Sequence, residues 1–334
     1  MAASRLEWLD VMKGVAILLV VVGHVLNNMQ LMHSPVNLWI HQFNMPFFFM
    51  LSGFLAWNTN KRSLWTNLKN KARSLLIPFL SCGFLYSFVF QKLDEWIGSL
   101  YHAGFWFLIS LFTCWLIFLP LAKLIGKLQL NKNIIAEAII LMIPFFLGNQ
   151  LMKILPADVN EMLSFPLTFA QYRFFILGYI IGKIYAKQYQ MGRIEDWIAK
   201  LGGQDLCVSY LLFVFFSFCA IAELSFVNHI PKTIVQVLLT TSLFGILYDS
   251  RIIMEKHLFA MLQHLGVRSL AIYVLHVFFV YQFTLGEVAL LAAGFQILIA
   301  VLLAIVVILL TLALATPIYK DSHLSYLFLG QIKK

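Results

Sequence analysis

The sequence predicts an all-α fold, a polytopic bundle of about ten membrane-spanning helices that forms a single domain over 1–334. Two observations predict this fold class. Hydrophobic residues make up 61% of the chain and charged residues 12%, whereas soluble globular chains carry about 45–50% and 25%. Apolar runs of about 20 residues, the length that crosses a bilayer, also recur from one end to the other. A water-soluble enzyme, a disordered protein and a disulfide scaffold are therefore excluded.

The expected spans are apolar runs that charged residues, proline or asparagine interrupt at each end. The first run follows Arg5 and ends in Asn-Asn-Met-Gln without the small-residue cleavage site of a signal peptide, so we expect a retained helix. The ten expected spans are 11–31, 38–57, 75–91, 104–125, 133–152, 164–185, 206–227, 231–249, 268–285 and 288–317. The longest outer connections are 91–104 and 152–164, which leaves no room for an extracytoplasmic soluble domain.

The formal net charge of +9 indicates membrane topology rather than nucleic-acid binding, because the basic residues lie in short segments between the apolar runs. With the N-terminus in the cytoplasm, 20 of the 24 lysines and arginines fall on the cytoplasmic side. This bias follows the positive-inside rule and requires an even number of spans. We therefore expect both termini in the cytoplasm.

Three polar residues of the first span, Asp10, Lys13 and His24, form one stripe on a helix, because eleven residues at about 100° each return nearly to the same face. His24 lies about 16 Å deeper than Lys13 at 1.5 Å per residue. Asp10 and Lys13 are alternatively an interfacial pair that extends to water, and His24 is alternatively a hydrogen-bonded structural residue. The functional hypothesis is that His24 is a general base, since a histidine at bilayer depth is costly and can accept a proton near neutral pH.

Two further ionisable residues lie inside expected spans. Arg173 is deeply embedded in the sixth span, and we expect a functional role or, alternatively, a pairing with Glu223. His276 lies in the ninth span and is either part of the site or a core histidine bonded to a neighbouring carbonyl. None of the other histidines has the spacing of a metal site, so no metal is expected.

The second span and the loop after it hold a second group of candidates. Asn44, Pro46 and Ser52-Gly53 interrupt an aromatic run, and Gly53 permits close approach of another helix, although packing alone explains them equally well. Lys71 and Arg73 belong to a basic cluster before the third span. This cluster is either ordinary positive-inside charge or, beside Lys13, a binding site for phosphates.

These segments resemble the membrane acyltransferases of type 3, and within them the sugar O-acetylase branch that includes fucose 4-O-acetylase-like proteins. Lys13 and His24 are similar to that family's signature of a basic residue, ten intervening residues and a histidine, with Lys13 where the family usually has Arg. Residues 43–54 are similar to its second-span motif, with Asn44 where this branch commonly has His. Further segments that resemble the family are Trp106-Phe107-Leu108, Phe174 to Tyr179, Tyr273 to His276, and the Lys71 and Arg73 cluster.

The resemblance implies transfer of an acyl group, most often acetyl from acetyl-CoA as co-substrate, to a hydroxyl of a carbohydrate such as O-antigen or exopolysaccharide, free or lipid-linked. His24 would act as base or acyl carrier, with Asp10 orienting Lys13 and with Lys71 and Arg73 binding CoA phosphates. The candidates for holding the acceptor or the oxyanion are Arg173, Asn44, Trp106 and His276. We expect no tightly bound cofactor, no nucleic-acid partner, and a location in the bacterial inner membrane. The competing function is a secondary transporter or flippase, since polar groups within a helical bundle also mark transport pathways.

Overall fold

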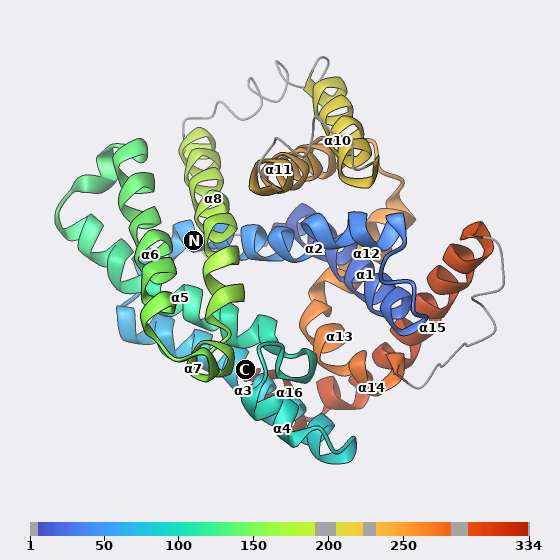
Figure 1. Cartoon of the computed structure of the whole chain (residues 1–334). Coiled ribbons are helices and arrows are strands. Elements are labelled where there is room, and N and C mark those ends of the chain that lie inside the picture. Colours follow the sequence, from blue (N-terminus) through green and yellow to red (C-terminus); the bar gives the residue numbers. More distant parts are fainter. Residues whose placement is uncertain (1–5, 191–204, 223–231, 282–292, 333–334) are drawn as a thin grey trace. The chain divides into compact units, whose positions relative to one another are not determined.

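The computed structural model describes residues 6–190, 205–222, 232–281 and 293–332, and among these residues all regular structure is helical (Figure 1). The α-helices are α1 (Glu7–Asn28), α2 (Pro35–Phe54), α3 (Leu64–Val89), α4 (Leu93–Gly98), α5 (Trp106–Lys127), α6 (Ile134–Ile154), α7 (Ala157–Met162), α8 (Phe165–Gln190), α10 (Asp205–Ala222), α11 (Lys232–Ser250), α12 (Lys256–Val267), α13 (Ser269–Leu275), α14 (Val277–Val280), α15 (Ala293–Lys320) and α16 (Ser322–Leu329). Three short 3-10 helices are η1 (Leu55–Lys61), η2 (His102–Gly104) and η3 (Leu130–Lys132).

Six of the described helices are long and apolar enough to cross a membrane, namely α1, α3, α5, α6, α11 and α15. A seventh span is added if α12 and the α13–α14 segment, which are bent by 60° at their junction, count as one crossing. The helical class of membrane protein is therefore confirmed. The count of about ten spans and the cytoplasmic location of both termini remain predictions.

The helix α12 corrects the sequence analysis, which assigned its residues to a cytoplasmic loop before a ninth span at 268–285. Arg251, Lys256 and Arg268 flank this helix, so its surroundings have the charge of a loop. Its N-terminus is capped by Glu255, whose carboxylate accepts a hydrogen bond of 2.9 Å from the backbone N–H of Leu258. The backbone N–H groups of His257 and Leu258 hold the pKa of Glu255 below its ordinary value.

The chain divides into two compact units, which are described separately below. Unit 1 consists of Met1–Phe48 and Lys187–Leu312, and unit 2 of Phe49–Ala186 and Ala313–Lys334.

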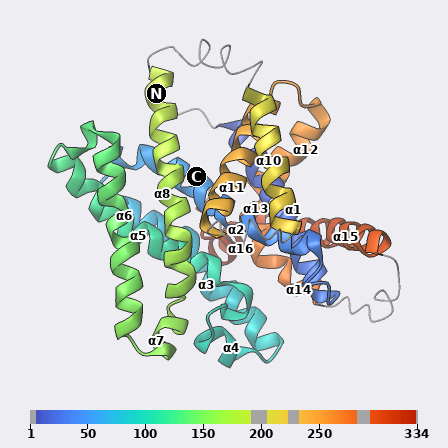
Figure 2. The ribbon, with the colours of Figure 1, turned by 45° about the horizontal axis from the view of Figure 1, so that its top comes forward.

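Unit 1 is organised around α1, which packs chiefly on α12 and also contacts α11, α13 and α14. Two glycines make the α1–α12 contact close: a Cβ at Gly14 would overlap the carbonyl oxygen of Leu262, and a Cβ at Gly266 would overlap that of Asp10. Helices in membranes commonly use small residues in this way, because the gain comes from close packing rather than from water exclusion. The helices α10 and α11 form a second pair in this unit (Figure 2).

Unit 2 is built on the packing of α3 against α5 and α16. The end of α2 contacts α8 through a second reciprocal pair of glycines, since a Cβ at Gly53 would overlap the Phe175 carbonyl and a Cβ at Gly178 would overlap that of Met50. The close helix approach expected at Gly53 is thereby confirmed. The chain also approaches α3 closely just after α16. Gly330 has a φ of +60°, and a Cβ there would overlap the carbonyl oxygen of Arg73 on α3.

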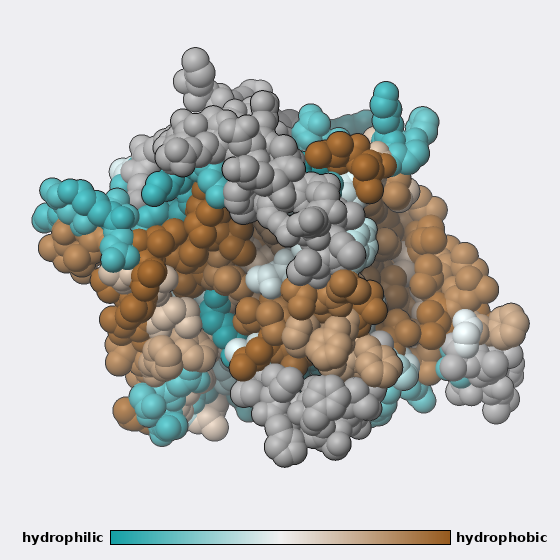
Figure 3. Space-filling model, turned by 90° about the horizontal axis from the view of Figure 1, so that it is seen from above, coloured by the Kyte–Doolittle hydropathy of each residue, from teal (hydrophilic) through white to brown (hydrophobic). Residues whose placement is uncertain are grey.

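Much of the outer surface of these helices is apolar, and brown side chains cover large areas of the face shown in Figure 3. Along α6, exposed apolar residues recur every three or four positions, at Ile135, Ile139, Ile143, Phe146 and Leu147, with Ile135 69% exposed. A soluble monomer rarely exposes a continuous apolar stripe of this kind. The stripe is the expected surface of a helix that faces lipid.

Candidate functional site

The polar stripe predicted on α1 lies within unit 1. Asp10 is buried, and its carboxylate forms a salt bridge of 3.2 Å with the ammonium group of Lys13, one helical turn later. The Lys13 side chain is 25% exposed. The backbone carbonyl of Asp10 also contacts Gly266 of α12, so this part of the stripe is held from both its side chain and its main chain.

His24, about one turn before the end of this apolar helix, lies against His276, with 5.1 Å between the ring centroids and 57° between the ring planes. His276 is fully buried in the bent segment that follows α12. The structure thus brings together two histidines that are 252 positions apart in the chain.

The hydrogen bonds of His276 determine which of its ring nitrogens carries the proton. Nδ1 lies 2.9 Å from the carbonyl oxygen of Ile272 and 2.7 Å from that of Tyr273. Carbonyl oxygens only accept hydrogen bonds, so Nδ1 is the protonated nitrogen and donates. Nε2 of the neutral ring therefore carries a lone pair, and this buried atom has no hydrogen-bond partner among the described residues. The carbonyl-bonded histidine that one interpretation of His276 expected is thus present, and the ring also contacts His24. A role of His276 in the site stays a prediction.

Asn44 is buried on α2, and its side-chain oxygen accepts a hydrogen bond of 2.7 Å from the backbone N–H of Met45. This oxygen is thus engaged locally. His41, one turn earlier on α2, lies against α1 at the residue before His24, since a Cβ at Gly23 would lie 3.3 Å from Cε1 of His41. No feature of the linear sequence marks His41, because its position beside His24 results from the packing of α2 against α1.

The basic residues Lys71 and Arg73 lie within unit 2, on α3. The ammonium group of Lys71 lies 3.7 Å from the ring centroid of Trp115, a cation–π contact. The Trp115 indole N–H in turn donates to the Ser52 hydroxyl over 3.2 Å. Arg73 is partly buried, with a hydrogen bond of 3.3 Å from Nη2 to the Asn70 side-chain oxygen, and its Nε has no partner in the described part of the chain. Although close in sequence, the two cations thus have different surroundings.

The remaining candidates in unit 2 are Trp106 and Arg173. Trp106 begins α5 and stacks on Phe49, with 6.3 Å between ring centroids. Arg173 is partly buried on α8, with its guanidinium carbon 5.1 Å from the ring centroid of Phe174. The alternative partner proposed for Arg173, Glu223, lies outside the described residues.

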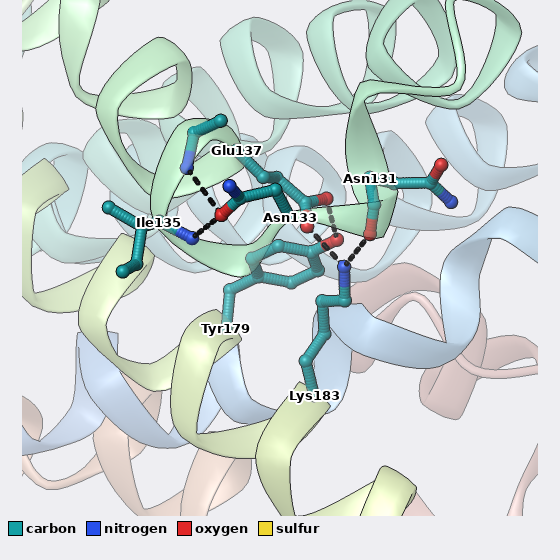
Figure 4. A network of polar contacts seen from close by, with 7 residues as sticks. Asn131, Asn133, Ile135, Glu137, Tyr179 and Lys183 are labelled. Carbon is teal, nitrogen blue, oxygen red and sulfur yellow. Dashed lines mark hydrogen bonds and ion pairs between the residues drawn. The ribbon is translucent and has the colours of Figure 1, made fainter.

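A buried ionic network in unit 2 was missed by the sequence analysis (Figure 4). Glu137, in the first turn of α6, forms a salt bridge with Lys183 of α8 and accepts a hydrogen bond of 2.7 Å from the Tyr179 hydroxyl. Lys183 also donates to the Asn131 carbonyl over 3.2 Å. Glu137 is the only acidic residue in the apolar run 134–154, which is the feature that could have identified it. Its carboxylate is saturated by these contacts, so the network is a structural connection between α6 and α8.

Within the described residues, no group of three or more His, Cys, Asp or Glu side chains is arranged to hold a metal ion. The ionisable side chains that unit 1 places on and against α1 include the imidazoles of His24 and His276 and the Asp10–Lys13 pair. Such groups accept and donate protons and balance charge, as acyl transfer to a hydroxyl requires.

The apolar helices and the contact of His24 with His276 define a polytopic membrane protein with candidate proton-transfer groups in its helical core. The chain belongs to the Acyl_transf_3 family, because the family model described as "Acyltransferase domain" matches residues 6–320. Neither the curated proteins nor the solved structures include a significant match to this chain. Membership of this family implies membrane acyltransferase activity and gives no support to the transporter alternative.

Proposed function

We propose that this acyltransferase moves an acetyl group from acetyl-CoA to a hydroxyl of a cell-surface or lipid-linked carbohydrate. The general reaction class follows from the family, whose model covers nearly the whole chain. The donor and the acceptor are our inference, supported by the resemblance of the α1, α2 and α13 segments to the sugar O-acetylase branch.

The observation that carries the proposal is the contact between His24 and His276, 5.1 Å apart by ring centroids. In the proposed reaction His24 removes the proton from the acceptor hydroxyl, and the oxygen attacks the thioester carbonyl carbon. The C–S bond then breaks, and the CoA thiolate takes up a proton to leave as the thiol. The products are the acetyl ester and CoA, so atoms and charge balance. His276, held in one tautomer by two backbone carbonyls, is proposed to position the His24 ring.

A second route remains open, in which His24 itself carries the acyl group before the sugar hydroxyl attacks it. This route predicts label bound to the protein when acetyl-CoA is supplied without acceptor. Direct transfer predicts no such protein-bound label.

Arg73 is the better candidate of the two α3 cations for a CoA phosphate. Its guanidinium has one hydrogen bond, to Asn70, and presents further donors with the geometry that phosphate oxygens prefer. Lys71 already directs its ammonium group at the Trp115 ring. Arg173, Asn44 and Trp106 remain candidates for binding the acceptor or the developing oxyanion.

The proposed membrane orientation places both termini in the cytoplasm, on the side that supplies acetyl-CoA. It is supported by the excess of lysine and arginine in the segments assigned to that side. The proposed location is the inner membrane of a bacterium, where O-antigen and exopolysaccharide precursors are assembled.

Acetyl transfer from radiolabelled acetyl-CoA into the glycan fraction of isolated membranes tests this proposal directly. Membranes that carry the wild type are compared with membranes that carry His24→Ala or His33→Ala at equal protein content. His33 is exposed in the turn between α1 and α2 and serves as the matched control.

We expect the wild type and His33→Ala to label the glycan equally and His24→Ala to lose roughly 10²–10⁴-fold in rate, the usual contribution of a general base. Label in the glycan with His24→Ala at the wild-type rate would overturn the assignment of His24. No label with any of the proteins would overturn the donor and acceptor.

A further inference from the structure

Three side chains of unit 1, those of Asn37, His41 and His276, lie near the segment of α1 that contains Gly23 and His24. A Cβ at Gly23 would lie 3.3 Å from Cε1 of His41 and 3.7 Å from Oδ1 of Asn37. His24 follows Gly23 directly, and its ring contacts His276. The absence of a side chain at Gly23 thus lets Asn37 and His41 lie against α1 at the residue that precedes the candidate base.

Each of these side chains directs its donor elsewhere. The Asn37 amide nitrogen donates to the Asn27 side-chain oxygen over 2.6 Å and to the Met32 carbonyl over 3.0 Å. Nδ1 of His41 lies 2.8 Å from the Asn37 carbonyl oxygen, so Nδ1 donates and Nε2 of the neutral ring carries the lone pair. His276 is arranged in the same way, with both carbonyl contacts on Nδ1.

What remains beside His24 is a set of hydrogen-bond acceptors. Oδ1 of Asn37 and Nε2 of His276 are buried and have no hydrogen-bond partner among the described residues. Nε2 of His41 belongs to an exposed side chain, and it is bonded to the Cε1 atom that lies over Gly23. An unsatisfied buried acceptor is costly, and a ligand that donates hydrogen bonds recovers this cost on binding.

We propose that Asn37 Oδ1, His41 Nε2 and His276 Nε2 form the subsite that accepts hydrogen bonds from the hydroxyl groups of the carbohydrate acceptor. This inference rests on the proposed function and deepens it. A sugar offers several O–H donors to these acceptors, whereas the ionised phosphates of CoA offer none. The subsite holds the hydroxyls that neighbour the acylated one, and thereby sets which hydroxyl reaches His24.

The test separates binding of the acceptor from binding of the donor. Initial rates of label transfer are measured with varied glycan extract, expressed as hexose equivalents, at saturating acetyl-CoA, and then with varied acetyl-CoA at saturating glycan. The variants are His41→Phe, which keeps a ring and removes the acceptor atom, and His41→Gln, whose amide oxygen can replace it. His33→Phe is the matched control for introducing an aromatic residue.

His276→Asn provides an independent variant, because its amide nitrogen retains a donor toward the backbone carbonyls and the Nε2 lone pair is lost. We expect His41→Phe and His276→Asn each to raise the KM for glycan about tenfold, equivalent to about 1.4 kcal/mol for one hydrogen bond. The KM for acetyl-CoA should stay within twofold of the wild type. His41→Gln should recover part of the glycan affinity lost in His41→Phe, and His33→Phe should resemble the wild type for both substrates.

The inference fails if His41→Phe and His276→Asn leave the KM for glycan unchanged, or if they raise the KM for acetyl-CoA by the same factor. Because the wild type is measured in the same experiment, its inability to transfer label would show instead that the proposed function is wrong. If His41→Phe does not accumulate in the membrane, the comparison of His276→Asn with wild type decides the question.

Discussion

Replacing Gly266 by alanine should destabilise the protein although alanine is the better helix former. Gly266 lies in α12, where a Cβ would overlap the carbonyl oxygen of Asp10 and lie 2.9 Å from the backbone nitrogen of Gly14. All the contacted atoms belong to the main chain of α1, so no side chain can rotate away. The two helices must separate instead, and the close contact along their length is weakened.

The magnitude follows from two opposing effects. Overpacking of a filled site costs about 1–3 kcal/mol, and a contact with rigid backbone belongs at the upper end of this range. Alanine recovers about 1 kcal/mol through its helix propensity. The expected net loss is therefore about 2 kcal/mol, which at roughly 2 °C per kcal/mol lowers the melting temperature by about 4 °C.

Thermal unfolding of the purified protein in detergent measures this loss, with Gly126→Ala as the matched control. Gly126 is also helical, near the end of α5, but a Cβ there would meet nothing within 4 Å. The control should be neutral or more stable by up to about 1 kcal/mol. A Gly266→Ala protein as stable as the Gly126→Ala protein would refute the close backbone contact.

Three further predictions concern other parts of the chain. Gly330→Ala forces a side chain into a left-handed backbone conformation and into the carbonyl of Arg73. Because Arg73 is the proposed ligand of a CoA phosphate, the KM for acetyl-CoA should rise severalfold in transfer assays. An unchanged KM would show that the position of α16 does not affect donor binding. Burial lowers the pKa of His102 below its ordinary value of 6.5. The contribution of the neutral His102 to stability is therefore complete above pH 6.5 and is lost as the pH falls toward the lowered pKa. Thermal unfolding measured against pH should show that His102→Gln loses less stability on acidification than the wild type. Lys183→Met should cost about 3 kcal/mol by leaving the Glu137 carboxylate buried without its cation, and adding Glu137→Gln should restore most of the melting temperature.

The helical class and the position of α1 could be predicted because they depend on local composition. The first apolar run ends within a few residues of α1, and the i, i+3 spacing of Asp10 and Lys13 already places the two charges together. The role of Gly53 was predictable for a similar reason, since a small residue among large aromatic ones indicates where another helix approaches.

The features that could not be predicted depend on tertiary packing. The helix α12 was missed because charged residues flank a short helix and because a 60° bend interrupts the apolar run that contains His276. The contact of His276 with His24 joins distant segments, and nothing in either segment specifies it. Likewise, Asn37 and His41 become candidates only when Gly23 is known to leave them next to α1.

The pairing of Glu137 with Lys183 has a consequence for biogenesis. The two residues are 46 positions apart, so at 5–20 residues per second the ribosome adds Glu137 roughly 2–9 s before it adds Lys183. During this interval the carboxyl group belongs to a helix whose apolar stripe already partitions into lipid, while its counter-charge does not yet exist. A lone carboxylate is expensive at bilayer depth, so the nascent α6 must hold its first turn at the interface. When α8 is synthesised, Lys183 supplies the missing counter-charge. The order of synthesis therefore makes α8 the helix that completes the membrane integration of α6.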